Sequence, residues 1–150
     1  MCIRDRCDSG YDWLTIDLEH STIDVDKAGD LIIVISLSGL TPLVRLTSLD
    51  INQIKRVMDA GAEGIIVPNI CTIDQAKKAV AATRYAPLGN RGVGLARAQG
   101  YGERFKEYLD WQKDNPIVIV QIENIEAIAD LKGIFNVEGV DGFMIGPYDL

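Results

Sequence analysis

The segment that most constrains the fold spans residues 117–123, with the sequence IVIVQIE. Its apolar, mostly β-branched residues lead into a glutamine and end at a carboxylate. Such runs are typical of strands in parallel sheets that helices cover on both faces. A charged residue that closes the strand lies where the strand meets the next loop, which is the edge at which α/β proteins build their sites. Glu123 is therefore the first candidate functional residue.

Four more strands are expected, at residues 11–18, 42–46, 64–68 and 141–145. Helices are expected around them, at residues 25–36, 51–60, 73–83, 103–113 and 124–131. Residues 31–35 are apolar enough to resemble a strand, but their place between two clearer strands favours a helix. The glycine-rich segment 90–102 is expected to form a loop. This alternation of strands and helices predicts a parallel sheet with right-handed crossovers.

Each expected strand ends in side chains that are capable of chemistry. They are Asp17, Glu19 and His20; Arg45; Asn69; Gln121 and Glu123; and Asp149. In a (β/α)8 barrel, the carboxyl ends of the strands gather at one face around the axis. Five strands do not close such a barrel. The chain is therefore either an open sheet or a partial (β/α)8 TIM barrel that lacks a strand before it and about two after it.

The 150 residues suffice for one ordinary domain, which is expected to span residues 10–150. Residues 1–9 fit nothing after them and are expected to be a non-native or disordered start. The net charge of −7 argues against nucleic acid and anionic membrane surfaces as partners. No apolar run is long enough to span a bilayer, and no signal peptide is evident. Cys2, Cys7 and Cys71 are an odd number without close pairing, as expected of a reduced cytoplasmic chain.

Glu123 and Asp149 are carboxylates on consecutive strand ends, without a set of cysteines and histidines around them. Oxygen ligands of this kind suit a hard divalent ion such as Mg2+ or Mn2+, with water and substrate completing the coordination. The alternative is structural. Glu123 would then cap the following helix, and Asp149 would begin a turn after Pro147.

His20 is the only histidine, which excludes a multi-histidine zinc site. An imidazole near its ordinary pKa is a natural general base at neutral pH, and Asp17 or Asp59 is a candidate to orient it. A lone histidine is more often structural, so both interpretations of His20 stay open.

Arg45, near the end of its strand, can hold a carboxylate through two hydrogen bonds. The alternative is an internal salt bridge with Glu19, Glu123 or Asp149. Both interpretations place the guanidinium among carboxylates at the same edge of the sheet.

The glycine-rich segment 89–94, GNRGVG, matches neither a phosphate-binding loop nor the dinucleotide fingerprint and is expected to be a tight turn. Arg91 and Arg97 beside it are expected to be solvated, although both could reach an anionic substrate. Cys71 is a weak candidate nucleophile because its base partner would have to be the single histidine, and small buried cysteines are common.

These segments resemble the HpcH/HpaI aldolase family, which comprises metal-dependent class II pyruvate aldolases. The resemblance covers residues 10–150 and consists of six motifs in the family's order: DWLTIDLEH, PLVR, MDAGAEGIIVPNICT, RYAPLGNRGVG followed by LARA, VQIE and GVDGFMIGPYDL. One such motif would be weak, but six in order are specific. The implied fold is a (β/α)8 barrel. Members begin with a strand that is absent here and continue through two more strands and a helix, so the chain is expected to be a fragment.

The resemblance also implies a metal site and a general base. By that resemblance, Glu123 and Asp149 match the metal ligands, and the ion would be Mg2+ or Mn2+, with Co2+ as a further option. His20 matches the family's general base. Asp17 and Asp59 match carboxylates that tune or orient this histidine.

The residues that would bind substrate follow from the same resemblance. Arg45 matches the arginine that binds pyruvate, and Gln121 matches a polar neighbour of the bound 2-oxo acid. Gly146 and Pro147 belong to the last motif and are expected to line the same pocket. Arg97 falls near an arginine that contacts the aldehyde portion of the substrate.

The implied reaction is the cleavage of a 4-hydroxy-2-oxo acid to pyruvate, or a related 2-oxo acid, and an aldehyde, as used in the catabolism of aromatic compounds. The full-length parent would be a homo-oligomer, with a hexamer expected. A related alternative is an acyl-CoA lyase of the citrate lyase β-subunit type, which shares the paired metal carboxylates. A third interpretation is a non-catalytic, metal-binding fragment.

Overall fold

The structure is a computed structural model that describes residues 3–150. Its five strands form one parallel sheet in the order β1-β2-β3-β4-β5. They are β1 (Trp13–Asp17), β2 (Thr41–Arg45), β3 (Gly64–Val67), β4 (Ile117–Ile122) and β5 (Gly142–Ile145). Each strand therefore pairs with the next strand in the sequence, as in a (β/α)8 barrel.

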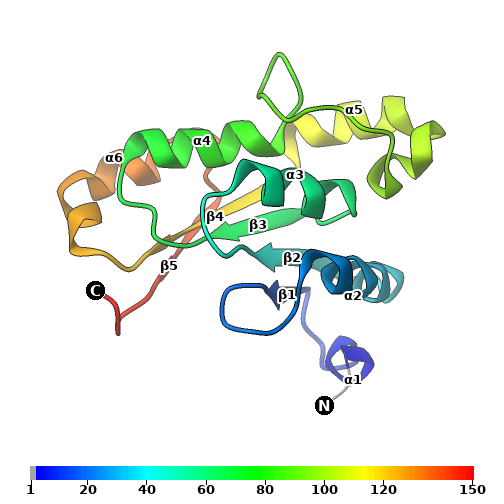
Figure 1. Ribbon diagram of the computed structural model, residues 1–150, viewed down its shortest axis with the longest axis horizontal. Coiled ribbons are helices and arrows are strands. Elements are labelled where there is room, and N and C mark those ends of the chain that lie inside the picture. The colour runs from blue at the N-terminus through cyan, green and yellow to red at the C-terminus, as the bar shows by residue number, and fades with distance from the viewer. Residues whose placement is uncertain (1–2) are drawn as a thin grey trace.

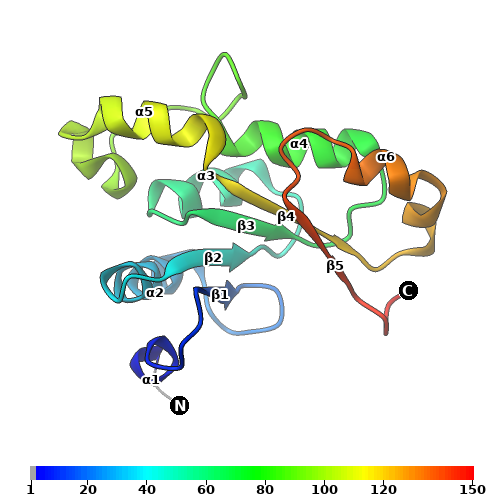
Figure 2. The ribbon, with the colours of Figure 1, turned by 180° about the vertical axis from the view of Figure 1, so that it is seen from behind.

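Helices connect the strands of this sheet. The α-helices are α1 (Ile3–Cys7), α2 (Val25–Leu37), α3 (Ile51–Asp59), α4 (Ile73–Thr83), α5 (Phe105–Asp114) and α6 (Leu131–Phe135). Two 3-10 helices are also present, η1 (Arg97–Gly102) and η2 (Ile125–Asp130). Figure 1 shows α2, α3 and α4 along one side of a curled sheet. Figure 2 shows the N-terminal end near β1 and the C-terminal end beyond β5, at opposite edges of the sheet. The predicted partial (β/α)8 barrel is confirmed.

The core lies between the sheet and these helices. All four residues of β3, the central strand, are buried. In α2, the buried residues Ala28, Ile32 and Ile35 recur at helical spacing and form one stripe against the core. This stripe explains why the uniformly apolar segment 31–35 forms a helix, as predicted.

Side-chain caps fix where the helices begin. Thr72 Oγ1 accepts the Gln75 N–H at 3.2 Å, and Gln75 Oε1 accepts the Thr72 N–H at 3.1 Å, which is the predicted capping box of α4. Asp50 accepts the Asn52 N–H at 2.8 Å at the start of α3. Both helices therefore leave the carboxyl edge of the sheet at defined residues.

Two segments differ from the prediction. Residues 124–131 were expected to form one α-helix, but the chain forms η2 and then the short helix α6. Asn124 still caps η2, as predicted, by accepting the Glu126 N–H at 3.0 Å. The expected loop at residues 90–102 contains η1, in which Gly100 and Tyr101 adopt left-handed backbone conformations. These conformations break the regular helical geometry, so the side chains of this segment do not follow a helical period in the sequence.

Residues 1–2, and with them Cys2, lie outside the described residues. Ile3 and Cys7, at the two ends of α1, pack against the hydrophobic core. That residues 1–9 are non-native or disordered stays a prediction. Across residues 3–150, no helix is both long and apolar enough to cross a membrane.

Candidate active site

An ion pair between Asp17 and Arg45 joins the carboxyl ends of β1 and β2. The two residues are register partners in the parallel ladder. Arg45 Nε donates to Asp17 Oδ1 at 2.9 Å, and Arg45 Nη2 donates to Asp17 Oδ2. These hydrogen bonds lower the pKa of Asp17 and raise the pKa of Arg45. Arg45 therefore makes its two-point hydrogen bond to a carboxylate of its own chain.

Asp17 also shapes the turn that carries His20. Its Oδ1 accepts the backbone N–H groups of Glu19 at 2.9 Å and His20 at 3.2 Å. Aspartate side chains commonly fix turns in this way. Ser21 Oγ donates to the Asp17 carbonyl oxygen at the same turn. Asp17 was expected to orient the imidazole, and in the structure it contacts the backbone of His20.

Glu19 lies between two basic side chains. Its Oε2 is 3.4 Å from Arg45 Nη1 and 3.7 Å from His20 Nε2. The Glu19 side chain is 18% exposed, and Oε2 is buried with no hydrogen-bond partner among residues 3–150. Burial, and then the nearby Glu123 carboxylate, raise the pKa of Glu19. The salt bridge between Arg45 and Glu19, which the sequence offered as an alternative, is present.

The Glu123 carboxylate, just after β4, is held from two sides. Its Oε1 accepts the Asn69 N–H at 2.7 Å, and its Oε2 accepts a hydrogen bond from Gln121 Nε2. Asn69 has a φ of 52°, in the left-handed region that asparagine tolerates better than most residues. Asn124 rather than Glu123 caps η2, so the structural alternative for Glu123 is wrong.

Gly146 lies against the Glu123 side chain, just after β5. The Gly146 N–H donates to Ile122 O at 2.9 Å. A Cβ atom on residue 146 would lie 2.8 Å from Glu123 Cβ and 3.0 Å from Glu123 Oε2, so this close approach requires glycine. Pro147 and Asp149 follow in an exposed turn, where the Asp149 N–H donates to Gly146 O at 3.3 Å.

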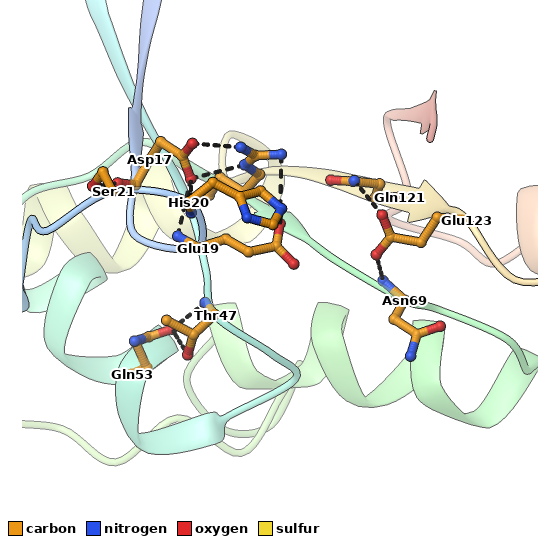
Figure 3. A network of polar contacts seen from close by, with 10 residues as sticks. Asp17, Glu19, His20, Ser21, Thr47, Gln53, Asn69, Gln121 and Glu123 are labelled. Carbon is orange, nitrogen blue, oxygen red and sulfur yellow. Dashed lines mark hydrogen bonds and ion pairs between the residues drawn. The ribbon is translucent and has the colours of Figure 1, made fainter. Parts of the chain in front are cut away.

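These contacts form two neighbouring groups of side chains at the carboxyl edge of the sheet. Figure 3 shows Asp17, Glu19 and His20 in one group and Asn69, Gln121 and Glu123 in the other. The negative charge of Glu123 helps to raise the pKa values of both Glu19 and Arg45, so the two groups interact electrostatically. The structure thus brings together most of the predicted site residues.

The surroundings of Glu123 fit a hard divalent cation. Gln121 is buried, and its Oε1 has no hydrogen-bond partner within the described part of the chain. An oxygen without a donor beside a carboxylate is the chemistry that Mg2+ or Mn2+ prefers. Residues 3–150 gather no group of three or more His, Cys, Asp or Glu side chains that could hold a metal ion. A site made by Glu123 and Asp149 would therefore need water and substrate as further ligands, and it stays a prediction.

The structure places Asp59 away from His20. Asp59 is the last residue of α3, which runs back from the end of β2 to the start of β3. Its Oδ1 is 3.9 Å from Arg91 Nε, and burial raises the pKa of Asp59. The expected orientation of His20 by Asp59 is not seen in this chain, because α3 carries Asp59 to the opposite edge of the sheet.

Arg91 was expected to be solvated, but it is buried. Its Cζ lies 4.2 Å from the centroid of the Tyr85 ring. Its guanidinium donates to Tyr108 Oη at 2.8 Å and to Thr83 O at 3.0 Å. The partners come from separate segments of the chain, so local sequence around Arg91 gave no sign of its burial.

Arg97 also lies at the amino edge of the sheet. Its Nη1 donates to Ala60 O at 3.0 Å, directly over Gly61 and before the start of β3. A cavity of about 460 Å³ beside it is lined by Arg97, Glu63 and Trp111, among others. Arg97 is therefore not brought to the strand-end site in this chain.

Cys71 is a poor nucleophile in this setting. It is buried, and its Sγ contacts the Asn69 side-chain oxygen at 3.3 Å. Burial raises the pKa of the Cys71 thiol, so the protonated form predominates at neutral pH.

The sequence as a whole matches a known protein family. A sequence model of the HpcH/HpaI aldolase/citrate lyase family matches residues 1–150. The chain belongs to the HpcH/HpaI aldolase/citrate lyase family. The resemblance seen in the six sequence motifs is confirmed.

A curated relative in this family is the 4-hydroxy-2-oxo-heptane-1,7-dioate aldolase of Salmonella typhimurium, which is 44% identical over 144 residues. The match covers 95% of this chain and 54% of the relative. The chain thus spans about half the length of the curated relatives that it matches.

Solved structures show the same fold. An HpcH/HpaI aldolase/citrate lyase family protein from Burkholderia cenocepacia superposes with a TM-score of 0.91 at 35% identity, over 99% of this chain and 60% of that one. The citrate synthase SbnG superposes with a TM-score of 0.86 at 30% identity, over 99% of this chain and 57% of that one. Both matches extend over the whole sheet described above.

Two contributions to the site of this HpcH/HpaI chain were missed from the sequence. One is the double contact of Glu19 with Arg45 and His20; the sequence indicated Glu19 only as a strand-end group capable of chemistry and as a possible salt-bridge partner of Arg45. The other is the backbone N–H of Asn69, which holds Glu123. The position of Glu19 next to His20 was the only sign of its contacts in the sequence. The backbone N–H of Asn69 could not be found in this way, because a pattern of side chains does not indicate which backbone groups donate hydrogen bonds.

Proposed function

We propose that this HpcH/HpaI chain provides the catalytic edge of a metal-dependent aldolase. The reaction is the cleavage of a 4-hydroxy-2-oxo acid to pyruvate, or a related 2-oxo acid, and an aldehyde. The observation that carries the proposal is the meeting of a histidine, an arginine and a carboxylate at one sheet edge: His20, Arg45 and Glu123. The name of the 44% identical Salmonella relative supports the same substrate class.

Arg45 would bind the substrate carboxylate. Its Nε and Nη2 are occupied by Asp17, whereas Nη1 lies 3.4 Å from Glu19 Oε2. This contact is an ion pair and not a hydrogen bond, because Glu19 Oε2 has no hydrogen-bond partner in the described part of the chain, so the carboxylate of a substrate would compete with Glu19 for the Nη1 donors. A guanidinium fixed by two hydrogen bonds on one side and by a longer ion pair on the other is suited to recognising a carboxylate.

His20 would act as the general base. Its side chain is 68% exposed at the carboxyl edge, so a substrate hydroxyl can reach it. The imidazole takes the proton of the 4-hydroxyl group while the C3–C4 bond breaks and the aldehyde forms. The bonding electrons pass to C3 and give the enolate of the 2-oxo acid, which a proton at C3 then converts to the free acid. Arg45, bound to the carboxylate end, would stabilise the developing negative charge.

Glu123 and Asp149 would hold Mg2+ or Mn2+, which supplies positive charge for the oxygen of the 2-oxo group when it is bound. Neighbouring groups of the chain hold the Glu123 carboxylate in a fixed position. The Asn69 N–H and the Gln121 amide fix both carboxylate oxygens, and Gly146 leaves room beside Oε2. Gln121 Oε1, which is buried and unpartnered in the described residues, would complete its hydrogen bonding when water or substrate enters.

A second candidate is a lyase or synthase that acts on CoA thioesters. The family name includes citrate lyase, and the 30% identical structural neighbour is a citrate synthase. The Nη1 group of Arg45, which Glu19 holds only by an ion pair, and the exposed His20 favour a small 2-oxo acid. Turnover of acetyl-CoA or a related thioester without turnover of hydroxy-oxo acids would establish the alternative.

The test is pyruvate release from 4-hydroxy-2-oxoheptanedioate, followed through lactate dehydrogenase, with and without Mg2+ or Mn2+. We expect release that requires the metal and falls about 100-fold or more in His20→Ala. Glu63→Gln, at the opposite edge, is the control and should retain the activity. Release that is independent of metal, or no release under any condition, would contradict the proposal.

The setting of the enzyme is part of the proposal. We expect a cytoplasmic protein in the catabolism of aromatic compounds, with a small 2-oxo acid and an aldehyde as its ligands. We also expect the full-length parent to be a homo-oligomer, with six subunits.

A further inference from the structure

Two successive backbone N–H groups after β3 point to the end of β4. The Asn69 N–H donates to Glu123 Oε1 at 2.7 Å, and the Ile70 N–H donates to Gln121 O at 3.1 Å. In an extended strand, successive N–H groups point to opposite sides. The left-handed backbone of Asn69, with a φ of 52°, turns both groups to the same side. The hydrogen bond to Glu123 therefore depends on one unusual backbone conformation.

The side chain of Cys71 lies against Asn69. Asparagine tolerates the left-handed region better than most residues, but its extended and right-handed conformations are also allowed. Cys71 Sγ donates to Asn69 Oδ1 at 3.3 Å and also lies 3.6 Å from Asn69 O. Burial raises the pKa of Cys71, so the thiol keeps the proton that it donates. The thiol thus contacts both oxygens of the residue with the left-handed backbone.

Cys71 is itself fixed to the start of α4. Its N–H donates to Gln75 Oε1 at 2.7 Å, and the same oxygen accepts the Thr72 N–H in the capping box. The Cys71 side chain is buried, whereas Asn69 is exposed. A buried side chain beside a capped helix start has few other positions. The thiol is therefore placed to restrain the more exposed asparagine.

We propose that Cys71 is a positioning residue whose thiol holds Asn69 in the left-handed conformation, so that the Asn69 N–H stays on the Glu123 carboxylate. The inference rests on the proposed function for the role of Glu123 as a metal ligand. It gives Cys71 a role that needs the protonated thiol and no nucleophilic chemistry. The start of α4 is thereby linked to the strand-end site through Gln75, Cys71 and Asn69.

The experiment measures the hydrogen-exchange protection of the Asn69 amide by NMR. Cys71→Ala removes the donor, and Cys71→Ser replaces the thiol with a hydroxyl donor at a similar side-chain volume. We expect Cys71→Ala to lower the protection about threefold, as suits a weak sulfur donor, and Cys71→Ser to keep more protection than Cys71→Ala. Cys7→Ser, on α1, is the matched control and should leave the protection unchanged.

A second pair of variants tests the backbone conformation directly. Glycine adopts the left-handed region without cost, whereas alanine disfavours it. We expect the amide of residue 69 to be about fivefold less protected in Asn69→Ala than in Asn69→Gly. The Leu46 amide, which donates to Ile66 O at 3.0 Å, is the internal control and should keep its protection in both variants.

Three results would overturn the inference. They are unchanged protection of the Asn69 amide in Cys71→Ala, equal losses in Cys71→Ser and Cys71→Ala, and equal protection in Asn69→Ala and Asn69→Gly. Circular dichroism shows whether each variant is folded, and the Asn69 pair keeps the test valid should Cys71→Ala not fold. Hydrogen exchange depends on neither metal nor turnover. Failure of this inference is therefore distinguishable from failure of the aldolase proposal, which the pyruvate assay tests.

Discussion

Arg45 and Asp17 face each other on one rung of the β1–β2 ladder and are joined by two hydrogen bonds. The pair ties an edge strand of the sheet to its neighbour at the end where the candidate active site lies. The same aspartate holds the backbone of Glu19 and His20. One carboxylate thus links the stability of the sheet edge to the geometry of the site.

Asp17→Asn should destabilise the chain at neutral pH, because it leaves Arg45 with one neutral acceptor in place of a carboxylate. The expected loss is about 1–2 kcal/mol in the free energy of unfolding, since the pair is only partly buried. The hydrogen bond from Arg45 lowers the pKa of Asp17 in the folded chain. Its stabilisation is therefore present above the unfolded pKa of about 3.9 and is lost as the pH falls through the lower, folded pKa.

Urea unfolding of wild type and Asp17→Asn at several pH values measures this effect. The difference between the two proteins should be largest near pH 7 and should shrink progressively below about pH 4. A difference that stays constant down to pH 2.5, or an Asp17→Asn variant as stable as wild type at pH 7, would show that the pair does not stabilise the sheet edge.

Glu63→Gln should increase the free energy of unfolding at neutral pH, whereas Asp17→Asn should decrease it. Burial alone raises the pKa of Glu63, and no ion pair offsets it within residues 3–150. An acid with a raised folded pKa destabilises the fold when it is ionised, so the penalty is present above the folded pKa and disappears below the unfolded pKa of about 4.3. We expect Glu63→Gln to gain about 0.5 kcal/mol at pH 7.5, after allowance for solvent screening.

The matching measurement is urea unfolding of Glu63→Gln and wild type at pH 7.5 and pH 4. The gain should be present at the higher pH and small at the lower one. A Glu63→Gln variant that is less stable than wild type at pH 7.5 would mean that Glu63 has a favourable partner in solution.

Arg91→Lys should be strongly destabilising. Lysine cannot keep both hydrogen bonds to Thr83 O and Tyr108 Oη, and it lacks the flat group that stacks on Tyr85. The expected cost is about 2–4 kcal/mol, as is usual when buried polar partners are left unsatisfied. Arg104→Lys, on an exposed arginine near the start of α5, is the matched control and should change stability by less than about 0.5 kcal/mol. Chemical denaturation measures both variants. Equal losses of stability in Arg91→Lys and Arg104→Lys would contradict the buried arrangement of Arg91.

Gly146→Ala should weaken metal binding without unfolding the chain. The added Cβ would lie 2.8 Å from Glu123 Cβ, so the Glu123 side chain must move. If Glu123 is a metal ligand as proposed, displacing it in this way should lower the affinity for Mn2+ about tenfold. The control is Gly142→Ala at the start of β5, where the nearest heavy atom to the new Cβ is 3.7 Å away. Calorimetric titration with Mn2+ compares the two, and equal affinities would place the metal away from Glu123.

The sheet and most of its helices could be predicted because their signals are local. Apolar runs in the sequence predict β3 and β4. The capping box of Thr72 and Gln75 predicts where α4 begins, and Asp50 predicts where α3 begins. The 3-10 helix η1 could not be predicted, since it depends on left-handed conformations at Gly100 and Tyr101 that no hydrophobic period reports.

The strand-end residues of the site were also predictable, because parallel strands deliver their carboxyl ends to one edge. The ion pairs between residues that are far apart in the sequence could not be predicted. Asp59 was expected near His20, but it lies with Arg91 at the other edge because α3 reverses the chain direction. Arg45 likewise contacts both Asp17 and Glu19, and sequence spacing does not show that.

The most direct test of the account is the exchange of pyruvate methyl protons with D2O, followed by NMR in the presence of Mg2+. This partial reaction requires the 2-oxo acid end of the site and no aldehyde. We predict exchange that depends on both the chain and Mg2+, is abolished by Glu123→Gln and is retained by Glu107→Gln, an exposed control on α5. Exchange that proceeds at the wild-type rate in Glu123→Gln, or that does not require the metal, would contradict the assignment of this edge as a metal-dependent 2-oxo acid site.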